Sequence, residues 1–100
     1  MNSSRIGVYK LTPGSAKEVV RRAEGGMLPV LRDQPGFVAY ELIQTGDSGL
    51  VSISTWRTHD EAEAAVKTIG GWVKEHMAEL TVSVENHVGD VAFRHLASRS

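Results

Sequence analysis

Two short runs of alternating apolar residues, joined by a glycine-containing turn and followed at once by a helix start signal, constrain this chain more than any other feature. Residues 34–75 contain QPGFVAYELIQ, a Gly-Asp-Ser-Gly turn, LVSISTW, and then a helix that starts near Thr58. Apolar alternation with a period of two indicates strands, and a connection with two glycines is typical of a hairpin. This stretch therefore predicts a β-hairpin that leads directly into a helix.

Two helices are predicted, each with an apolar stripe at helical spacing. Ser15 with Glu18, and Thr58 with Glu61, have the spacing of a capping box, in which the two side chains satisfy free backbone N–H groups of the first turn. The first helix contains two glycines and a proline, so we expect it to bend or restart over residues 25–29. The second contains another glycine pair at 70–71, where we expect a bend or a close backbone contact.

Four strands are predicted, at residues 5–11, 37–44, 50–56 and 81–88, with a further short strand at 91–96. The strand at 37–44 is apolar on both faces, with Tyr40 on one face and Phe37 on the other, which favours an internal position in the sheet. In the last strand, we expect Val82, Val84 and Val88 to point inward. The order β-α-β-β-α-β predicts an α+β, ferredoxin-like protomer with an antiparallel sheet. It forms a single domain over residues 5–96, with flexible termini at 1–4 and 97–100.

The face of this sheet that the helices leave uncovered also carries apolar residues, and a second copy of the chain is the simplest cover. At 100 residues, the chain is near the lower end of what buries a useful core alone, so oligomerisation is expected. The formal charge of −1 favours neither nucleic acid nor an acidic membrane surface as a partner. No apolar segment is long enough to span a membrane, and there is no cysteine, so the cytoplasm is the expected location.

Four segments carry a resemblance to a known family: KLTPGSAKEVV, LRDQPGFVAYELIQ, VSISTWRTHDEAEAA and WVKEHMAEL. With these segments the chain resembles the antibiotic-biosynthesis-monooxygenase-like family of dimeric α+β barrels. The resemblance implies two ferredoxin-like protomers whose sheets pack together, each with a pocket between its sheet and its helices. Members of the superfamily include cofactor-independent oxygenases, haem-degrading oxygenases and isomerases.

The haem-degrading members use an asparagine on the first strand, a tryptophan on the second long helix and a histidine further along it as the iron ligand. His76 stands at the histidine position, but Gly7 and Val66 stand where the other two residues would fall. We therefore expect no cofactor. The histidines also lack the spacing of a helical metal-binding pair, so no metal site is predicted.

The candidate site residues are one histidine and three aromatic residues. His76 and Trp72 are four residues apart on one helix face, so they are neighbours there. In the functional interpretation, His76 is the catalytic base and Trp72 a wall against a planar substrate; the alternative is a half-exposed histidine beside a core tryptophan. Tyr40 and Tyr9 are candidates for substrate binding through their hydroxyl groups, although aromatic residues also fit strands for packing reasons alone.

Two classes of function remain open. The resemblance implies a cofactor-independent monooxygenase, or a related tailoring enzyme, that acts on a small aromatic or polyketide-like molecule. The alternative is a non-catalytic homodimeric module that binds a small apolar ligand. An open cavity where His76 and a tyrosine hydroxyl converge favours catalysis, whereas a closed apolar gap favours the binding module.

Overall fold

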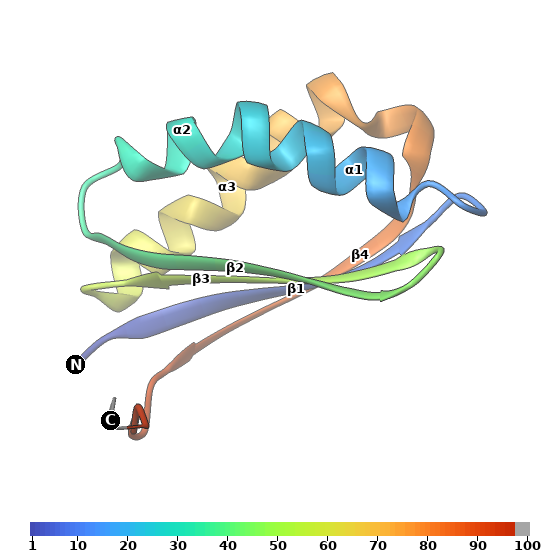
Figure 1. Ribbon diagram of the computed structural model, residues 1–100. Helices are drawn as coiled ribbons and strands as arrows, with labels where there is room; N and C mark the ends of the chain where they lie inside the picture. Colours follow the sequence, from blue (N-terminus) through green and yellow to red (C-terminus); the bar gives the residue numbers. More distant parts are fainter. Residues whose placement is uncertain (98–100) are drawn as a thin grey trace.

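The computed structural model describes residues 1–97 and has the predicted β-α-β-β-α-β order (Figure 1). A π-helical turn, Ala23–Met27, joins the first two helical segments, and a short 3₁₀ helix, Ala78–Leu80, precedes the last strand. The ferredoxin-like α+β fold predicted from the sequence is thus confirmed. The other elements are β1 (Ser3–Leu11), α1 (Ala16–Arg22), α2 (Leu28–Arg32), β2 (Phe37–Gly46), β3 (Gly49–Trp56), α3 (His59–His76) and β4 (Thr81–Asp90).

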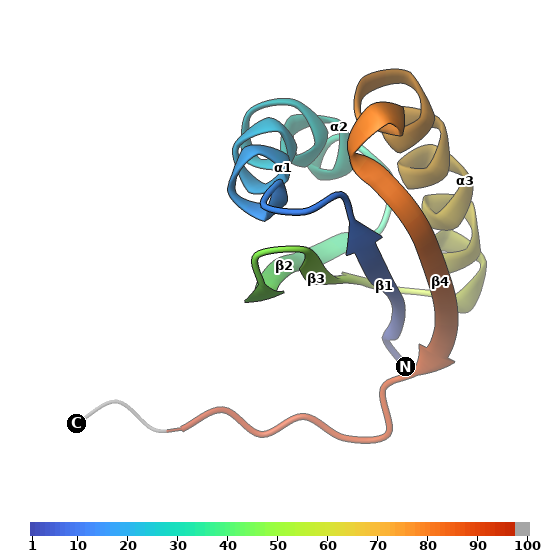
Figure 2. The ribbon, with the colours of Figure 1, turned by 90° about the vertical axis from the view of Figure 1, so that its right-hand side faces the viewer.

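The four strands form one antiparallel sheet in the order β2-β3-β1-β4. All helices lie on the same face of this sheet (Figures 1 and 2). The segments α1 and α2 contact β2, whereas α3 contacts β1, β3 and β4. The expected internal position of β2 is wrong, because β2 is an edge strand. Apolar residues on both faces of a strand indicate that something packs above and below the sheet. They do not indicate whether the strand has a neighbouring strand on each side.

Strand alternation divides β1 and β3 between the two faces of the sheet. Toward the helices β1 presents Arg5, Gly7 and Tyr9, and β3 presents Leu50 and Ser52; all five are buried. On the open face, Ile6 pairs with Ile53 and Val8 with Val51. The helical face therefore combines polar and apolar side chains, while the centre of the open face is apolar.

A bulge in β2 changes one predicted side-chain direction. The pairing of β2 with β3 shifts between Phe37 and Ala39, which leaves Val38 out of register. Phe37 therefore joins Tyr40 and the core on the helical face, where its ring makes an edge-on contact with Trp56 at 5.6 Å between centroids. The sequence alternation placed Phe37 on the other face, because it assumed an uninterrupted strand.

The edge strand β4 is more exposed than predicted. Val82 and Val84 are 58% and 42% exposed, and only Val88 packs partly against the core. The pairing with β1 shifts between Lys10 and Leu11, so Val82 falls at the irregularity. Val84 is the register partner of Tyr9, so it does point to the helical face as predicted, but its edge position leaves it exposed. The expected burial is therefore wrong for Val82 and Val84, since alternation alone does not reveal an uncovered edge.

Of the two predicted capping boxes, only the one at Thr58 makes its N-cap hydrogen bond, and its glutamate binds the Thr58 hydroxyl in place of the backbone N–H. Thr58 Oγ1 accepts a hydrogen bond from the Glu61 backbone N–H at 3.1 Å, and its hydroxyl donates to the Glu61 carboxylate. The Ser15 hydroxyl instead donates to the Thr12 carbonyl, while Glu18 binds arginines. The expected restart of the first helix is confirmed, since the π-helical turn contains the first glycine pair and α2 begins beside Pro29.

The second glycine pair has no packing role within the described residues. The helix α3 runs without interruption from His59 to His76 across Gly70 and Gly71. A Cβ atom added at either glycine meets nothing within 4 Å. The expected close backbone contact at this pair is therefore wrong.

Both predicted terminal boundaries need adjustment. β1 begins at Ser3, two residues before the predicted start, because the buried Ser3 hydroxyl donates a 2.6 Å hydrogen bond to Asp90. The extra strand predicted at 91–96 is absent from the described residues: the Val91 N–H donates to the Asn2 carbonyl at 2.8 Å, but the segment forms no strand, and Phe93 is 86% exposed. Figure 2 shows this segment running away from the helices, below the strands. Of the predicted flexible segment 97–100, residues 98–100 lie outside the described residues.

Candidate active site

A small cavity lies between the helices and the sheet. Its volume is about 10 Å³, which is room for roughly one water molecule. Two flexible methionine side chains form part of its wall, one from the end of the π-helical turn and one from the residue after α3. The lining residues are Tyr9, Val19, Ala23, Met27, Tyr40, Leu42, Leu50, Ser52 and Met77.

Three of the lining residues carry hydroxyl groups, but the surface that the cavity exposes is entirely apolar. Tyr9, Tyr40 and Ser52 come from β1, β2 and β3, and all three face the helices. The Ser52 hydroxyl donates to the Tyr40 hydroxyl at 3.4 Å. The sheet thus brings together two of the predicted substrate-binding residues, Tyr9 and Tyr40, on neighbouring positions of one cavity wall.

Behind this wall lies a buried arginine that the sequence analysis missed. Arg5 is 1% exposed. Its guanidinium donates to Tyr9 Oη at 3.0 Å, to Ser52 Oγ at 3.3 Å and, through Nε, to Asn86 Oδ1 at 2.8 Å. It also lies 5.6 Å from the centre of the Tyr9 ring. Every one of these partners is uncharged, and no carboxylate of the described residues forms an ion pair with Arg5.

Gly7 makes room for this guanidinium. Gly7 stands between Arg5 and Tyr9 on the same face of β1. A Cβ atom added there would lie 2.5 Å from Arg5 Nη2 and 2.7 Å from Cζ, which is closer than real contacts permit. The absence of a side chain at Gly7 therefore lets the Arg5 guanidinium lie across the strand and reach β3 and β4.

The burial of Arg5 could have been predicted from its position in the strand. A charged residue shares the strand face of Gly7 and Tyr9, which is the face that alternation assigns opposite to Ile6 and Val8. Charged residues are rarely buried unless they have a partner or a function. An arginine in phase with buried positions is thus a reason to look for a polar site.

Burial also sets the protonation state of Tyr40. Desolvation raises the pKa of the Tyr40 hydroxyl, and the hydrogen bond from Ser52 offsets part of this effect. The nearby Arg5 charge also lowers the Tyr40 pKa, but burial is the largest cause. At neutral pH, Tyr40 is a neutral phenol that can donate a hydrogen bond.

The other two predicted site residues line a separate hollow on the surface. The Trp72 and His76 rings lie 4.8 Å apart between centroids, with 36° between their planes. Together with Arg21, Arg22 and Gly25 they border an open hollow of about 380 Å³. The His76 side chain is 47% exposed. The structure therefore brings Trp72 and His76 together, but not in the hollow that Tyr9 and Tyr40 line.

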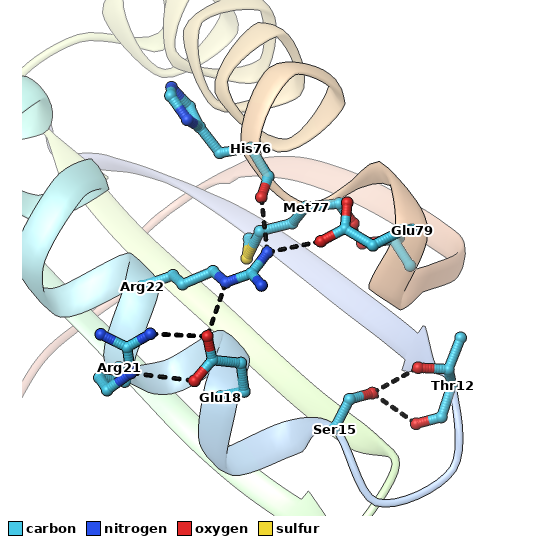
Figure 3. A network of polar contacts seen from close by, with 9 residues as sticks. Thr12, Ser15, Glu18, Arg21, Arg22, His76, Met77 and Glu79 are labelled. Carbon is cyan, nitrogen blue, oxygen red and sulfur yellow. Dashed lines mark hydrogen bonds and ion pairs between the residues drawn. The ribbon is translucent and has the colours of Figure 1, made fainter.

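The two arginines beside this hollow are already engaged in ion pairs. The Glu18 carboxylate accepts hydrogen bonds from both Arg21 and Arg22. Arg22 Nη1 also donates to the Glu79 carboxylate at 2.6 Å and to the His76 backbone carbonyl at 2.8 Å. Figure 3 shows the His76 ring pointing away from this network, so only its main chain takes part.

Comparison with known proteins places the chain in a family. The family model for antibiotic biosynthesis monooxygenase matches residues 4–79. No curated protein matches the sequence. Within residues 1–97, no helix has the length and apolar character needed to cross a membrane, and no three His, Asp or Glu side chains gather where they would hold a metal ion.

Three solved structures illustrate the similarity of fold. NE2512 from Nitrosomonas europaea, of unknown function, has 14% identity and a TM-score of 0.80, over 98% of this chain and 96% of that chain. The monooxygenase from the gene ActVA-Orf6 of Streptomyces coelicolor, in complex with nanaomycin D, has 14% identity and a TM-score of 0.75, over 97% and 93%. SnoaB, a cofactor-independent oxygenase from Streptomyces nogalater, has 18% identity and a TM-score of 0.70, over 93% and 95%. With a family model matching most of its length and this shared fold, the chain belongs to the antibiotic biosynthesis monooxygenase family.

Proposed function

We propose that the protein is a cofactor-independent monooxygenase that acts on a small aromatic, polyketide-like molecule in the cavity between its helices and its sheet. The observation that carries this proposal is an apolar cavity between the helices and the sheet that has Tyr9, Tyr40 and Ser52 among its lining residues. Apolar walls accept a planar ring, while the hydroxyl groups orient its oxygen substituents. Family membership and the named activities of SnoaB and the Streptomyces coelicolor protein support the same class of reaction.

In this reaction the substrate supplies the electrons. A base removes a proton from an acidic carbon, and the resulting carbanion transfers an electron to O₂. The two radicals combine into a hydroperoxide, which loses water to leave a carbonyl group. One oxygen atom thus enters the substrate and the other leaves as water, so a CH₂ group becomes C=O. The protein's contribution is to position the substrate and to stabilise the anion.

His76 stays our sequence-based hypothesis for the base, with Trp72 as a substrate-binding residue. The ring of His76 borders the surface hollow beside Trp72, and His76 is not among the residues that line the cavity. If His76 is the base, the His76→Ala variant loses about 10²-fold or more in kcat. Unchanged turnover and ligand affinity in this variant would remove His76 from the mechanism and leave the cavity hydroxyl groups as the reactive site.

The monooxygenase proposal is tested with the anthrone dithranol as a probe. We expect the protein to accelerate O₂ uptake, with one O₂ consumed per anthraquinone formed. The Tyr40→Phe variant should lower this rate, since it removes a hydrogen-bond donor and little volume. The matched control is Phe37→Tyr, which adds a hydroxyl on the same strand outside the cavity lining. A rate equal to that of heat-denatured protein would reject dithranol-type oxygenation.

The second candidate is a non-catalytic module that binds a small apolar ligand. The small volume of the cavity, about 10 Å³, favours it, because a multi-ring molecule enters only if side chains move. Met27 and Met77 are the adaptable part of the wall, since methionine changes conformation more readily than branched residues. Ligand binding by calorimetry without any O₂ uptake would select this second function.

We also propose that two copies pair through the open faces of their sheets to form a dimeric α+β barrel. The centre of this face is apolar, with Val8 and Ile43 each 43% exposed. The segment after β4 and the open face together border a hollow of about 380 Å³, to which Phe93 contributes. A homodimer in the cytoplasm is thus the state in which we expect the protein to act.

A further inference from the structure

We infer that two copies of the chain pair with their two-fold axis along the strands, so that Glu41 on β2 of each copy meets His87 on β4 of the other. This inference rests on the dimer proposed above, and it adds the orientation of the two sheets and the residues that select it. It starts from the charged side chains at the two edges of the open face.

Glu41 and His87 stand at opposite ends of one row of side chains across the open face. Glu41 pairs with Ile53 on β3. Ile53 pairs with Ile6 on β1, which in turn pairs with His87 on β4. Both end residues are exposed. The row therefore has an acid at one edge of the sheet, two isoleucines in the middle and a histidine at the other edge.

The surroundings of both end residues leave room for a partner. Glu41 borders the hollow of about 380 Å³ between the open face and the segment after β4. Arg94 borders the same hollow, but within residues 1–97 it forms no ion pair with Glu41. At the other edge, His87 Nε2 lies 3.0 Å from the Glu85 carboxylate of its own strand, and the His87 side chain is 57% exposed. In its protonated form, His87 has a second ring N–H for one more carboxylate.

The charges distinguish the two ways in which the sheets can pack. Packed sheets keep their strands within about 30° of each other, so the two-fold axis runs either along the strands or across them. An axis across the strands places β2 of one copy on β2 of the other. Because β2 contains no lysine, arginine or histidine, Glu41 would then be covered without a counter-charge, which is unfavourable.

An axis along the strands gives Glu41 its counter-charge. It places β2 of each copy on β4 of the other and superimposes each row on the same row of the partner. His87 then lies between its own Glu85 and the partner's Glu41. Since a two-fold interface repeats every contact, the dimer contains this charged contact twice. The open face is thus complementary to a second copy of itself in this orientation.

The orientation is tested by cross-linking, because the chain contains no cysteine. Ala39 and Gly89 end the neighbouring row, so cysteines there leave Glu41 and His87 in place. A Cβ atom added at Gly89 meets nothing within 4 Å. A mixture of Ala39→Cys and Gly89→Cys, left to exchange subunits, should give a covalent dimer with a short bismaleimide, whereas either variant alone should not. No covalent dimer from the mixture, or one from Ala39→Cys alone, would overturn the inference.

The charge selection is tested by sedimentation equilibrium. Glu41→Gln should weaken the dimer about tenfold, because two charged contacts are lost. The matched control is Glu24→Gln, which changes an exposed glutamate on the helical side and should leave the affinity unchanged. His87→Glu should also weaken the dimer, and adding Glu41→Lys to that variant should restore it. A double variant no tighter than His87→Glu alone would overturn the proposed contact.

These measurements separate the inference from the proposals beneath it. A wild-type chain that sediments as a monomer would reject the dimer and its orientation together. A wild-type dimer without a link between positions 39 and 89 would reject the orientation alone. Oxygen uptake with dithranol is measured independently, so its absence would reject the oxygenase and leave the orientation intact.

Discussion

Arg5 and the hydroxyl groups around it connect three strands through side chains. Arg5 starts on β1 and reaches Ser52 on β3 and Asn86 on β4. Arg5→Met should lower the melting temperature, because it leaves the oxygens of Tyr9, Ser52 and Asn86 without the donor that they share. An unchanged melting temperature in this variant would contradict a stabilising role for the network.

At the residue scale, the first prediction concerns the protonation of Tyr40. Burial raises the pKa of its hydroxyl above the ordinary value of 10.0. The folded protein therefore holds this proton more tightly than the unfolded chain. The associated stability is complete below pH 10 and is lost as the pH rises through the higher pKa of the folded state.

This prediction is checked by absorbance titration of tyrosinate. The chain has two tyrosines, so the Tyr40→Phe variant identifies the signal of Tyr40 by its loss. The same variant should show a weaker fall in stability at alkaline pH. A Tyr40 titration midpoint at or below 10 would contradict the buried, neutral hydroxyl described here.

At the element scale, one arginine connects the end of α1 to the end of α3. Arg22 on α1 binds Glu18 in its own helix and Glu79 in the turn after α3, and it donates to the carbonyl of His76 (Figure 3). The hydrogen bonds from Arg21 and Arg22 lower the pKa of Glu18 to about 2.

The Glu18 contacts predict a dependence of stability on acid pH. Because the folded-state pKa of Glu18 is depressed, its contribution is complete above the ordinary value of 4.5 and is lost as the pH falls through about 2. Solvent screens these exposed ion pairs, so we expect a shallow effect. Denaturation at pH 6 and pH 2.5 should show a smaller difference for Glu18→Gln than for wild type. The control variant is Glu24→Gln, which changes another exposed helical glutamate and should leave that difference unchanged.

The glycines of α3 give a second prediction at this scale. Gly70→Ala and Gly71→Ala should each stabilise the protein by about 0.5 to 1 kcal/mol, because alanine is the better helix former and nothing obstructs its side chain. Gly26→Ala is the contrasting variant, since its Cβ would lie 2.8 Å from Trp72 Cζ2. It should destabilise the protein or displace Trp72, as measured by urea denaturation and tryptophan fluorescence. Equal effects at all three positions would refute this packing difference.

The elements were predictable from the sequence because they depend on local patterns. Hairpin alternation, the Thr58 capping box and the apolar stripe of α3 each act within a few residues. The bulge at Val38, the edge positions of the strands and the network around Arg5 depend on cross-strand register, which no local pattern contains. For the same reason, the sequence analysis placed His76 and Tyr40 in one site. In the structure, Tyr40 lines the cavity between the helices and the sheet, whereas His76 borders the surface hollow.

At the scale of the whole molecule, the sheet has one face covered by helices and one face open. The Val8→Lys variant places a charge at the centre of the open face, so it should convert the proposed homodimer into a monomer of 10.9 kDa. Val30→Lys is the matched control, because Val30 is similarly exposed, at 39%, but lies on α2. Sedimentation at micromolar concentration measures both variants. A wild-type protein that sediments as a compact monomer would refute the dimer.

The central claim is that ligands enter the space between the helices and the sheet, beside Tyr9, Tyr40 and Ser52. The most direct measurement is a titration of ¹⁵N-labelled protein with 4-nitrophenol, followed by amide chemical shifts. We predict the largest changes at Tyr9, Tyr40 and Ser52. Changes confined to Trp72 and His76 would instead place the ligand in the surface hollow and contradict this account.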